Sequence, residues 1–237
     1  MRLFVDLALA GEADIELPAA AARHVQVRRL QPGDALRLFD GRGGEWRATV
    51  QRMGRTQVVV RVAGFDPVER EAALPATVAL GMPANERMDF LVEKATELGV
   101  HAIQPLLCER SVLRLSGERA QRKREHWQAI AVAAAEQCGR TRVPQVSPVC
   151  ALLAFLDRPH AEAQRVLLSP AADTPALHQL QPDPCGLITL SGPEGGLTAA
   201  EEQAALASGF RRMQLGARML RAETAPLAVL AWLGLRG

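Results

Sequence analysis

Two short glycine-bearing stretches near the end of the chain carry the residue types that could form a binding site. The first is Gly192-Pro193-Glu194-Gly195-Gly196, and the second runs from Leu215 to Arg221. Each follows a short apolar run typical of a buried strand, and each precedes a segment with a helical pattern. Glycine lets bare backbone approach a ligand, and open α/β sheets bind ligands at the carboxyl ends of their strands. The two loops therefore predict a small-molecule pocket lined largely by main chain.

The charge of the first loop restricts what this pocket could bind. A glycine loop that opens a helix can hold phosphate on its free amides, but Glu194 places a carboxylate among these glycines. The loop matches neither the Gly-x-x-x-x-Gly-Lys-Ser/Thr phosphate pattern nor the Gly-x-Gly-x-x-Gly dinucleotide pattern. An acidic glycine loop better suits a ligand without phosphate, including a cationic one.

The second loop ends in a dense run of polar residues. Thr224 is expected to be the N-cap of the last helix, with Pro226 in the first turn, where its missing N–H costs nothing. Taken singly, each polar residue has a structural explanation, since Glu223 favours a helix start and Arg218 and Arg221 could be surface cations. Together with the two glycine loops, they favour a functional site.

Alternating strands and helices from about residue 76 must position these loops, and this alternation predicts a mostly parallel sheet. Gly99 and Gly139 would close two of the helices, and Thr198 with Glu201 has the form of a capping box. The last helix is apolar on nearly every side, which indicates burial in the fold or against another subunit. The expected strands are 77–80, 100–107, 165–168, 187–190 and 213–215, and the expected helices are 87–98, 120–138, 151–156, 199–208 and 227–235.

The first 70 residues have a different pattern, with short β segments separated by turn residues. The expected strands are 25–27, 35–39, 46–50 and 57–62, with a short helix over 23–30 as the alternative for the first of them. Such a region is a candidate small β-barrel of the kind that often carries an RNA-binding surface, and a purely structural β module fits it equally well. Residues 67–75 are expected to be a linker.

The composition is that of an ordinary globular protein. The 237 residues are 48% hydrophobic and 23% charged, and no apolar run is long enough to span a membrane. Asp6 comes too early for a signal peptide. The four cysteines lack a Cys-x-x-Cys pair, so we expect reduced thiols in a cytoplasmic protein, with no zinc site and no disulfide framework.

The basic residues are unevenly distributed along the chain, although the net charge is only +2. Nearly all of them are arginine, and base composition of the genome or an ordinary solvated face could explain that bias. Their clustering in two regions instead favours a polyanionic partner. The first cluster is Arg37, Arg42, Arg47, Arg52, Arg55 and Arg61, and the second is Arg110, Arg114, Arg119, Arg122, Lys123, Arg124, Arg140 and Arg142.

Several strings together resemble a known family. Gly-Pro-Glu-Gly-Gly-Leu and the later Leu-Gly-x-Arg-x-Leu-Arg-x-Glu-Thr-Ala resemble the knotted SPOUT class of RNA methyltransferases, and more narrowly the RsmE family of bacterial small-subunit ribosomal RNA uridine N3-methyltransferases. The resemblance covers essentially the whole chain, and it departs at Ala217, where a proline is usual, and at Pro226, where a small residue is usual. The other matching strings are His24 to Leu30, Glu93 to Val100, Glu109-Arg110-Ser111 and Glu136 to Arg140.

This resemblance implies the fold and the partners. It implies a PUA-like RNA-binding β-barrel over 1–70, followed by a SPOUT α/β domain with a trefoil knot over 74–237. It also implies a homodimer, the cofactor S-adenosyl-L-methionine, and a substrate that is 16S ribosomal RNA or the small ribosomal subunit. Neither a metal nor a membrane is implied.

The resemblance also implies roles for individual residues. Arg221 would stabilise the anion that develops on the uracil, and Glu194 would be the base or the partner of the sulfonium, with orientation of the loop amides as its structural alternative. RNA contacts are expected from His24, Arg28, Arg29, Arg110 and Arg140. The cofactor site would comprise Leu190, Gly192, Pro193, Glu194, Gly195, Gly196, Leu215, Gly216, Leu220, Arg221 and Thr224.

Three other functions stay open at this point. A SPOUT methyltransferase could act on another RNA position, such as a ribose 2′-hydroxyl in transfer RNA. An RNA-binding assembly factor that has lost catalysis would be opposed by the intact glycine loops. A nucleotide-dependent oxidoreductase is disfavoured because neither loop has a dinucleotide fingerprint.

Overall fold

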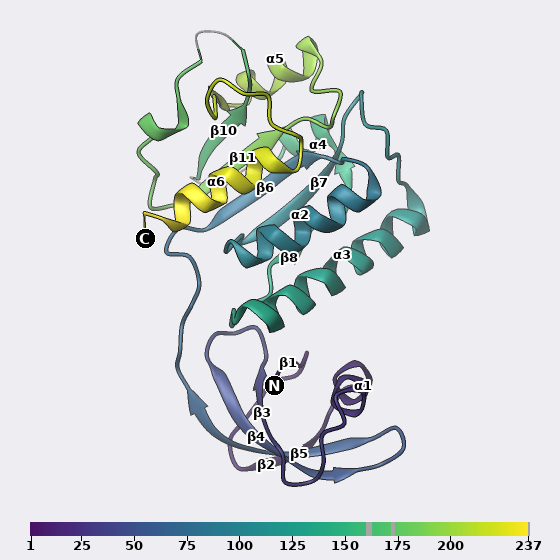
Figure 1. Ribbon diagram of the computed structural model, residues 1–237. Helices are drawn as coiled ribbons and strands as arrows, with labels where there is room; N and C mark the ends of the chain where they lie inside the picture. The colour runs from purple at the N-terminus through teal and green to yellow at the C-terminus, as the bar shows by residue number, and fades with distance from the viewer. Residues whose placement is uncertain (160–162, 172–173, 237) are drawn as a thin grey trace. The chain divides into compact units, whose positions relative to one another are not determined.

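The computed structural model describes residues 1–159, 163–171 and 174–236, and the chain divides into two compact units (Figure 1). One unit is formed by Met1–Glu71 with Ala135–Val143, and the other by Ala72–Ala134 with Pro144–Gly237. The segment Ala135–Val143 thus belongs with the N-terminal residues, although it lies far from them along the chain. The domains expected from the sequence, 1–70 and 74–237, remain a prediction.

The N-terminal unit is built on a five-stranded sheet with the order β1-β3-β4-β5-β2. Strands β1 and β3 are parallel, and the other neighbours are antiparallel. Three of the expected strands correspond to β3, β4 and β5, whereas β1 and β2 are too short to have given a period-two signal. The strands are β1 (Arg2–Phe4), β2 (Ala13–Glu16), β3 (Ala35–Phe39), β4 (Glu45–Met53) and β5 (Val58–Asp66).

A helix covers the segment for which the sequence offered both a strand and a helix. Helix α1 spans Ala19–Val27, so the helical alternative is correct in type and the strand over 25–27 is wrong. The helix places Ala22 and Val25 in the core of the sheet, next to Leu38 and Val60. A helical period of 3.6 residues explains this burial, because residues three positions apart, such as Ala22 and Val25, lie on the same face.

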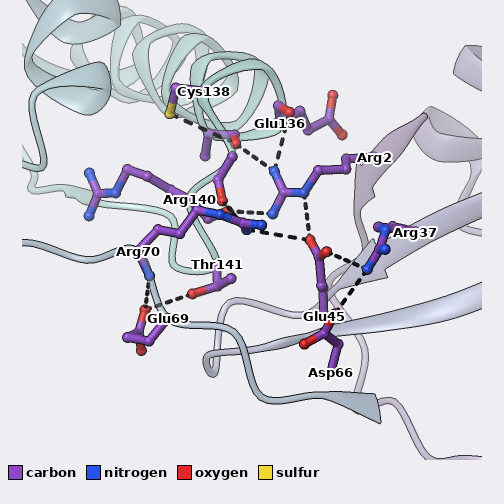
Figure 2. Close-up of polar contacts among 12 residues, drawn as sticks. Arg2, Arg37, Glu45, Asp66, Glu69, Arg70, Glu136, Cys138, Arg140 and Thr141 are labelled. Carbon is purple, nitrogen blue, oxygen red and sulfur yellow. Dashed lines mark hydrogen bonds and ion pairs between the residues drawn. The ribbon is translucent and has the colours of Figure 1, made fainter. Parts of the chain in front are cut away.

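A buried carboxylate joins the N-terminal strands to the segment Ala135–Val143 (Figure 2). Only 2% of the Glu45 side chain is exposed, and it accepts hydrogen bonds from Arg2 Nε at 2.8 Å and from Arg37 Nη1 at 2.7 Å. The guanidinium of Arg2 also donates to the backbone oxygens of Ala135 at 3.1 Å and Glu136 at 3.2 Å, in the last turn of the helix that ends at Cys138, and to that of Arg140 at 2.8 Å. One arginine therefore satisfies both a buried acid and the free carbonyls at the end of a helix.

The expected linker is also attached within this unit (Figure 2). The carboxylate of Glu71 pairs with Arg140 and accepts a hydrogen bond from Thr141 N, while Glu69 accepts one from the Thr141 hydroxyl at 3.0 Å. Residues 67–75 contain no helix or strand, as expected. Their first part is nevertheless fixed by side-chain contacts that the sequence did not predict.

The C-terminal unit is built on a seven-stranded sheet with the order β12-β10-β11-β6-β7-β8, in which β9 also pairs with β7. Every pair of neighbouring strands described in it is parallel, which confirms the predicted α/β class. The strands are β6 (Ala76–Gly81), β7 (Ala102–Leu107), β8 (Gln145–Val146), β9 (Cys150–Ala151), β10 (Gln164–Leu168), β11 (Leu187–Ser191) and β12 (Arg211–Met213).

Helices cover the two faces of this sheet (Figure 1). Helices α2 and α6 pack against each other, and α4 packs against α5 over a core that includes Leu167, Leu190 and Phe210. All five predicted helices of this unit are present. The helices are α2 (Asn85–Glu97), α3 (Gly117–Cys138), α4 (Leu152–Leu156), α5 (Ala199–Ala207) and α6 (Thr224–Gly234), with a 3₁₀ turn at Leu177–Gln179.

We expect the Glu45 contacts to contribute strongly to the stability of the N-terminal unit. Glu45→Gln removes the buried charge that faces Arg2 and Arg37, and it should lower the free energy of unfolding by about 3 kcal/mol. Glu12→Gln is the matched control, because Glu12 also pairs with an arginine, Arg61, but is 79% exposed. That change should cost less than about 1 kcal/mol. Urea unfolding followed by tryptophan fluorescence, to which Trp46 of the N-terminal unit contributes, would measure both, and equal effects would contradict the role of Glu45.

Candidate active site

The first glycine loop connects β11 to α5, and its shape depends on the absence of side chains. A Cβ on Gly192 would lie 2.7 Å from the backbone carbonyl carbon of Gly196 and 2.7 Å from Leu197 N. Gly196 has φ of +68°, in the left-handed region that favours glycine. The helix that follows begins with the predicted capping box between Thr198 and Glu201, so this prediction is confirmed. The loop is therefore a tight turn that only glycine permits at both ends.

Three neighbouring elements hold this loop in place. Pro193 packs onto the end of β6, where a Cβ on Gly81 would lie 2.4 Å from Pro193 Cδ. Arg110 Nη1, from the segment after β7, donates to the backbone oxygen of Gly195 at 3.0 Å. Glu201 Oε1 accepts a hydrogen bond from Glu109 N at 2.8 Å. The ends of β6, β7 and β11 thus meet around one loop, as a parallel sheet requires.

The second glycine loop connects β12 to α6 and faces open space. Gly216 has φ of +100°, and a Cβ there would meet no atom within 4 Å. The carbonyl of Arg221 accepts hydrogen bonds from Thr224 N at 2.9 Å and Ala225 N at 3.1 Å. The N-cap of α6 is Glu223, and Thr224 is already helical. The expected N-cap at Thr224 is therefore wrong by one residue, because these bonds to Arg221 start the helix without a side-chain cap.

The two loops enclose a cavity of about 510 Å³ at the carboxyl ends of the strands. Nearly all the residues predicted for the cofactor site line it. The exceptions are Leu190, whose side chain is fully buried in the core below, and Thr224, which is exposed on α6. The lining comprises Arg87, Leu168, Ser169, Pro170, Ser191, Gly192, Pro193, Glu194, Gly195, Gly196, Met213, Leu215, Gly216, Arg218, Met219, Leu220, Arg221, Ala222 and Ala225.

An arginine that the sequence did not single out lies between acids of both loops. Arg87, in the first turn of α2, donates from Nη1 to Glu194 Oε1 at 3.2 Å, and its Nε lies 4.0 Å from Glu223 Oε1. Glu194 Oε1 also accepts a hydrogen bond from Ala84 N at 2.9 Å. Arg87 and Glu194 are 107 residues apart in sequence, so no local pattern could have predicted the pair. The carboxylate of Glu194 is accordingly engaged in holding the loop.

Two buried polar atoms beside the cavity lack a hydrogen-bond partner among the described residues. They are the hydroxyl oxygen of Ser191 and Oε2 of Glu223, whose residues are only 5% and 7% exposed. A buried polar group without a partner is costly, so such atoms mark places where a ligand or water completes the bonding. Ser191 lines the cavity directly and ends β11. The site therefore offers polar atoms as well as apolar walls.

The basic residues at the cavity and those predicted to contact RNA in the N-terminal unit differ in exposure and in whether they pair with an acid. Arg218 and Arg221 are exposed, and no salt bridge to an acid is found for either within the described residues. Arg28 and Arg29 are also exposed, whereas His24 Nδ1 lies 3.4 Å from Glu136. Arg140 is only 5% exposed and pairs with Glu71. We therefore assign Arg140 a role in holding its own unit together, in place of the predicted RNA contact.

Some of the predicted basic clusters are neutralised by neighbouring acids. Arg37 pairs with Glu45 and Asp66, and Arg61 pairs with Glu12 and Asp14. Counting arginines along the chain therefore overestimated the positive charge that this unit offers to a polyanion.

Within residues 1–159, 163–171 and 174–236, no group of histidine, cysteine, aspartate and glutamate side chains is arranged to hold a metal ion. No helix among these residues is long and apolar enough to cross a membrane.

The fold and the cavity define an RNA methyltransferase. A family model for the RNA methyltransferase domain matches residues 70–234, and a model for the RNA methyltransferase PUA domain matches residues 17–63. The chain belongs to the ribosomal RNA small subunit methyltransferase E family. This confirms the resemblance seen in the sequence and the predicted PUA-like unit, while the trefoil knot stays a prediction.

Two relatives of this name are about a third identical to the chain over the aligned residues. The enzyme of Synechocystis is 36% identical over 227 residues, which cover 93% of this chain and 72% of the relative. The enzyme of Bacillus subtilis is 32% identical, with 87% and 84% covered. These shares extend across both units, so the likeness is not confined to the glycine loops.

Two solved structures share the fold over nearly their whole length. The first is ribosomal RNA small subunit methyltransferase E of Neisseria gonorrhoeae bound to S-adenosylmethionine, with a TM-score of 0.92, 35% identity and 98% and 96% of the two chains covered. The second is a putative methyltransferase of Legionella pneumophila in complex with the same cofactor, with a TM-score of 0.92, 33% identity and 100% and 97% covered.

The packing around the first loop predicts a difference in reactivity between two cysteines. Burial raises the pKa of the Cys108 thiol to about 12, with a smaller effect of the nearby Glu201 charge. Since the thiolate is the reactive form, Cys108 should resist iodoacetamide at pH 8, far below that pKa. The exposed Cys185 is the control and should be alkylated under the same conditions. Peptide mass spectrometry would measure both, and equal rates would contradict the packing described here.

Proposed function

We propose that the chain transfers a methyl group from S-adenosyl-L-methionine to N3 of one uridine in 16S ribosomal RNA, uridine 1498 in the usual numbering of that RNA. The observation that carries this proposal is the cavity of about 510 Å³ between the two glycine loops. Its volume lies within the range of small-molecule sites. Further support comes from the two similar structures, both of which contain S-adenosylmethionine.

The residues at the cavity fit this cofactor. Main-chain groups of Gly192, Gly196 and Gly216 would surround its adenine and ribose, and the unpartnered hydroxyl of Ser191 would complete a hydrogen bond there. The acidic side chain of Glu194 suits a ligand with a positive charge better than it suits a phosphate. When bound, S-adenosylmethionine supplies an electrophilic methyl group on a sulfonium centre.

The protein's own contribution is positioning and charge stabilisation. Uridine N3 carries a proton at neutral pH, so the nitrogen attacks the methyl carbon only as that proton leaves. Negative charge then spreads over the two uracil carbonyl oxygens. Arg221 is exposed at the cavity and is not paired with a described acid, so its guanidinium is available to bind those oxygens. Fixed positive charge aimed at a developing anion is the main way in which such a site accelerates the reaction.

Glu194 is better placed to position the loop than to remove the proton. It already accepts hydrogen bonds from Ala84 N and from Arg87 Nη1, so its Oε1 is engaged in holding the loop. We therefore propose that Glu194 and Arg87 hold the first loop against α2. Removal of the proton from N3 is left to solvent or to a group that the substrate brings close.

We also propose that the chain binds RNA and forms a homodimer. Arg28 and Arg29 in the N-terminal unit, and Arg110 in the C-terminal unit, would bind phosphates around the target. A second copy of the chain would cover the exposed Phe90 of α2 and Leu235 at the end of α6, two helices that pack together. Reaction on ribosomal RNA would take place in the cytoplasm.

Mapping the modified nucleotide tests the proposed function. Small ribosomal subunits that lack this methyl group would be incubated with the protein and labelled S-adenosylmethionine, and the RNA analysed by mass spectrometry. We expect one methyl group on N3 of the target uridine. A methyl group on another base or on a ribose would contradict the position, and absence of methyl transfer would contradict the enzymatic function.

Replacing Arg221 should separate chemistry from cofactor binding. Arg221→Ala removes the guanidinium that would stabilise the uracil anion, so the single-turnover methylation rate should fall by about 100-fold or more. Cofactor affinity measured by calorimetry should change by less than about twofold, because the main chain forms most of the pocket. Arg221→Lys keeps the charge without the planar fork and should recover only part of the rate. An unchanged rate in Arg221→Ala would exclude the assigned role.

A second substitution tests the backbone shape of the pocket. Gly192→Ala forces a Cβ to within 2.7 Å of the Gly196–Leu197 backbone, so the first loop must open. Cofactor affinity should fall by about 100-fold, or roughly 2.7 kcal/mol. Gly234→Ala, in α6, is the control because a Cβ there meets no atom within 4 Å. Equal affinities in calorimetry for the two variants would show that the loop does not form the site.

A further inference from the structure

We propose that Val112 is an apolar wedge that packs against an RNA base beside the target uridine when that uridine is extruded into the active site. The proposal rests on the proposed function and adds an element outside the predicted site. Val112 lies in the segment Glu109–Ser116, which follows β7, and 79% of its side chain is exposed. An isolated exposed valine would need no explanation, but this one lies two residues from Arg110, which binds the first glycine loop.

Anchors on both sides fix the direction of the Val112 side chain. Ser111, Leu113 and Leu115 are 5%, 8% and 2% exposed, while Val112 and Arg114 between them point outward. One face of the segment thus packs against the protein, and Val112 and Arg114 lie on the other face. The Ser111 hydroxyl accepts a hydrogen bond from Cys108 N at 3.0 Å, and Ser111 N donates to Cys108 O at 3.1 Å. Val112 is therefore presented to solvent by a well-packed segment.

The same segment is attached to the first glycine loop. Arg110 Nη1 donates to Gly195 O, and a Cβ on Gly195 would lie 3.1 Å from Arg110 Cβ, so the two segments are in close contact. Glu109 N donates to Glu201, the residue that also caps α5. Gly195 lines the cavity, and Val112 is only two residues from its partner Arg110. The wedge therefore lies next to the wall of the proposed cofactor site.

The charges around Val112 indicate what it meets. Arg110 and Arg114 precede and follow it by two residues, and both are exposed. Arg114 Nη2 donates to the carbonyl of Glu109 at 2.8 Å, which fixes the guanidinium close to the chain. An apolar side chain between two cations suits a polyanion that also offers flat apolar faces. RNA provides both, in its phosphates and its unstacked bases.

The second glycine loop carries a similar arrangement on the other wall of the cavity. Met219 is 78% exposed and lies between Arg218 and Arg221. The second loop, which lines the cavity, and the segment that binds the first loop thus each present an exposed apolar side chain near arginines. A binding surface for RNA at the cavity mouth explains this repetition, whereas chance exposure does not favour arginine at the flanking positions.

The chemistry of the reaction requires such an element. N3 of a stacked or paired uridine is inaccessible, so the nucleotide must leave its stack to reach the methyl group. Apolar side chains of other nucleic-acid-binding proteins fill the gap at an unstacked step and so lower the cost of opening it. Val112 would stabilise the extruded state in this way, while Arg110 and Arg114 hold the neighbouring phosphates.

The test compares single-turnover methylation of unmodified small ribosomal subunits at saturating protein and S-adenosylmethionine. Val112→Ala should lower the rate by about tenfold, as expected for the loss of one base contact. Val112→Leu keeps an apolar tip and should recover most of that loss. Leu153→Ala is the matched control, because Leu153 is an apolar side chain of α4 that is 57% exposed and has no arginine two residues before or after it. It should leave the rate unchanged.

Two further measurements show whether a lower methylation rate comes from the loss of the base contact or from a change in cofactor binding or assembly. Calorimetry should give the same S-adenosylmethionine affinity for Val112→Ala as for the unmodified chain, and sedimentation should give the same assembly state. An unchanged rate in Val112→Ala, or a change in assembly that accounts for the lost rate, would overturn the wedge. If the unmodified chain itself transfers no methyl group to the subunits, the proposed function fails, and this result is distinct from a failure of the wedge alone.

Discussion

Close packing of main chain at the carboxyl ends of β6 and β11 is the constraint on which the site depends. Gly81 leaves room for Pro193, and Gly192 leaves room for the turn at Gly196. With side chains at these positions, the first loop could not return over the sheet and α5 could not begin at its capping box. The pocket is therefore a consequence of backbone geometry, and its side chains adjust charge and polarity around a shape that is already fixed.

Charged contacts connect this shape to the surrounding elements. Arg87 links acids of both glycine loops to α2, and Arg110 links the first loop to the segment after β7. Each of these arginines fixes one element of the fold to another. Its other N–H groups lie at or near the cavity. In the N-terminal unit, Arg2 likewise has two kinds of partner. It donates to the carboxylate of Glu45 and to backbone oxygens at the end of α3. Arginine suits these positions because its planar group can donate in several directions at once.

Much of this organisation was predictable from the sequence, because it depends on local signals. Glycines after apolar runs located both loops, and Thr198 with Glu201 identified the start of α5 correctly. The pairs Arg87–Glu194 and Arg140–Glu71 were not predictable, since each joins residues distant in sequence and no period connects them. Arg140 is an example of what is missed when such pairs cannot be predicted. Its charge suggested an RNA contact, whereas its burial indicates a structural role. The N-cap of α6 was predicted one residue too late. Hydrogen bonds from Thr224 N and Ala225 N to the carbonyl of Arg221 take the place of the expected side-chain cap.

Hydrogen–deuterium exchange with and without S-adenosylmethionine would test most directly whether the two glycine loops form one cofactor site. We predict that binding slows exchange in two separate stretches, the backbone around 192–197 and that around 215–222. Exchange in α4 and in the strands of the N-terminal unit should stay unchanged. Protection of only one loop, or protection elsewhere with both loops unaffected, would contradict the conclusion that these loops are two walls of a single pocket.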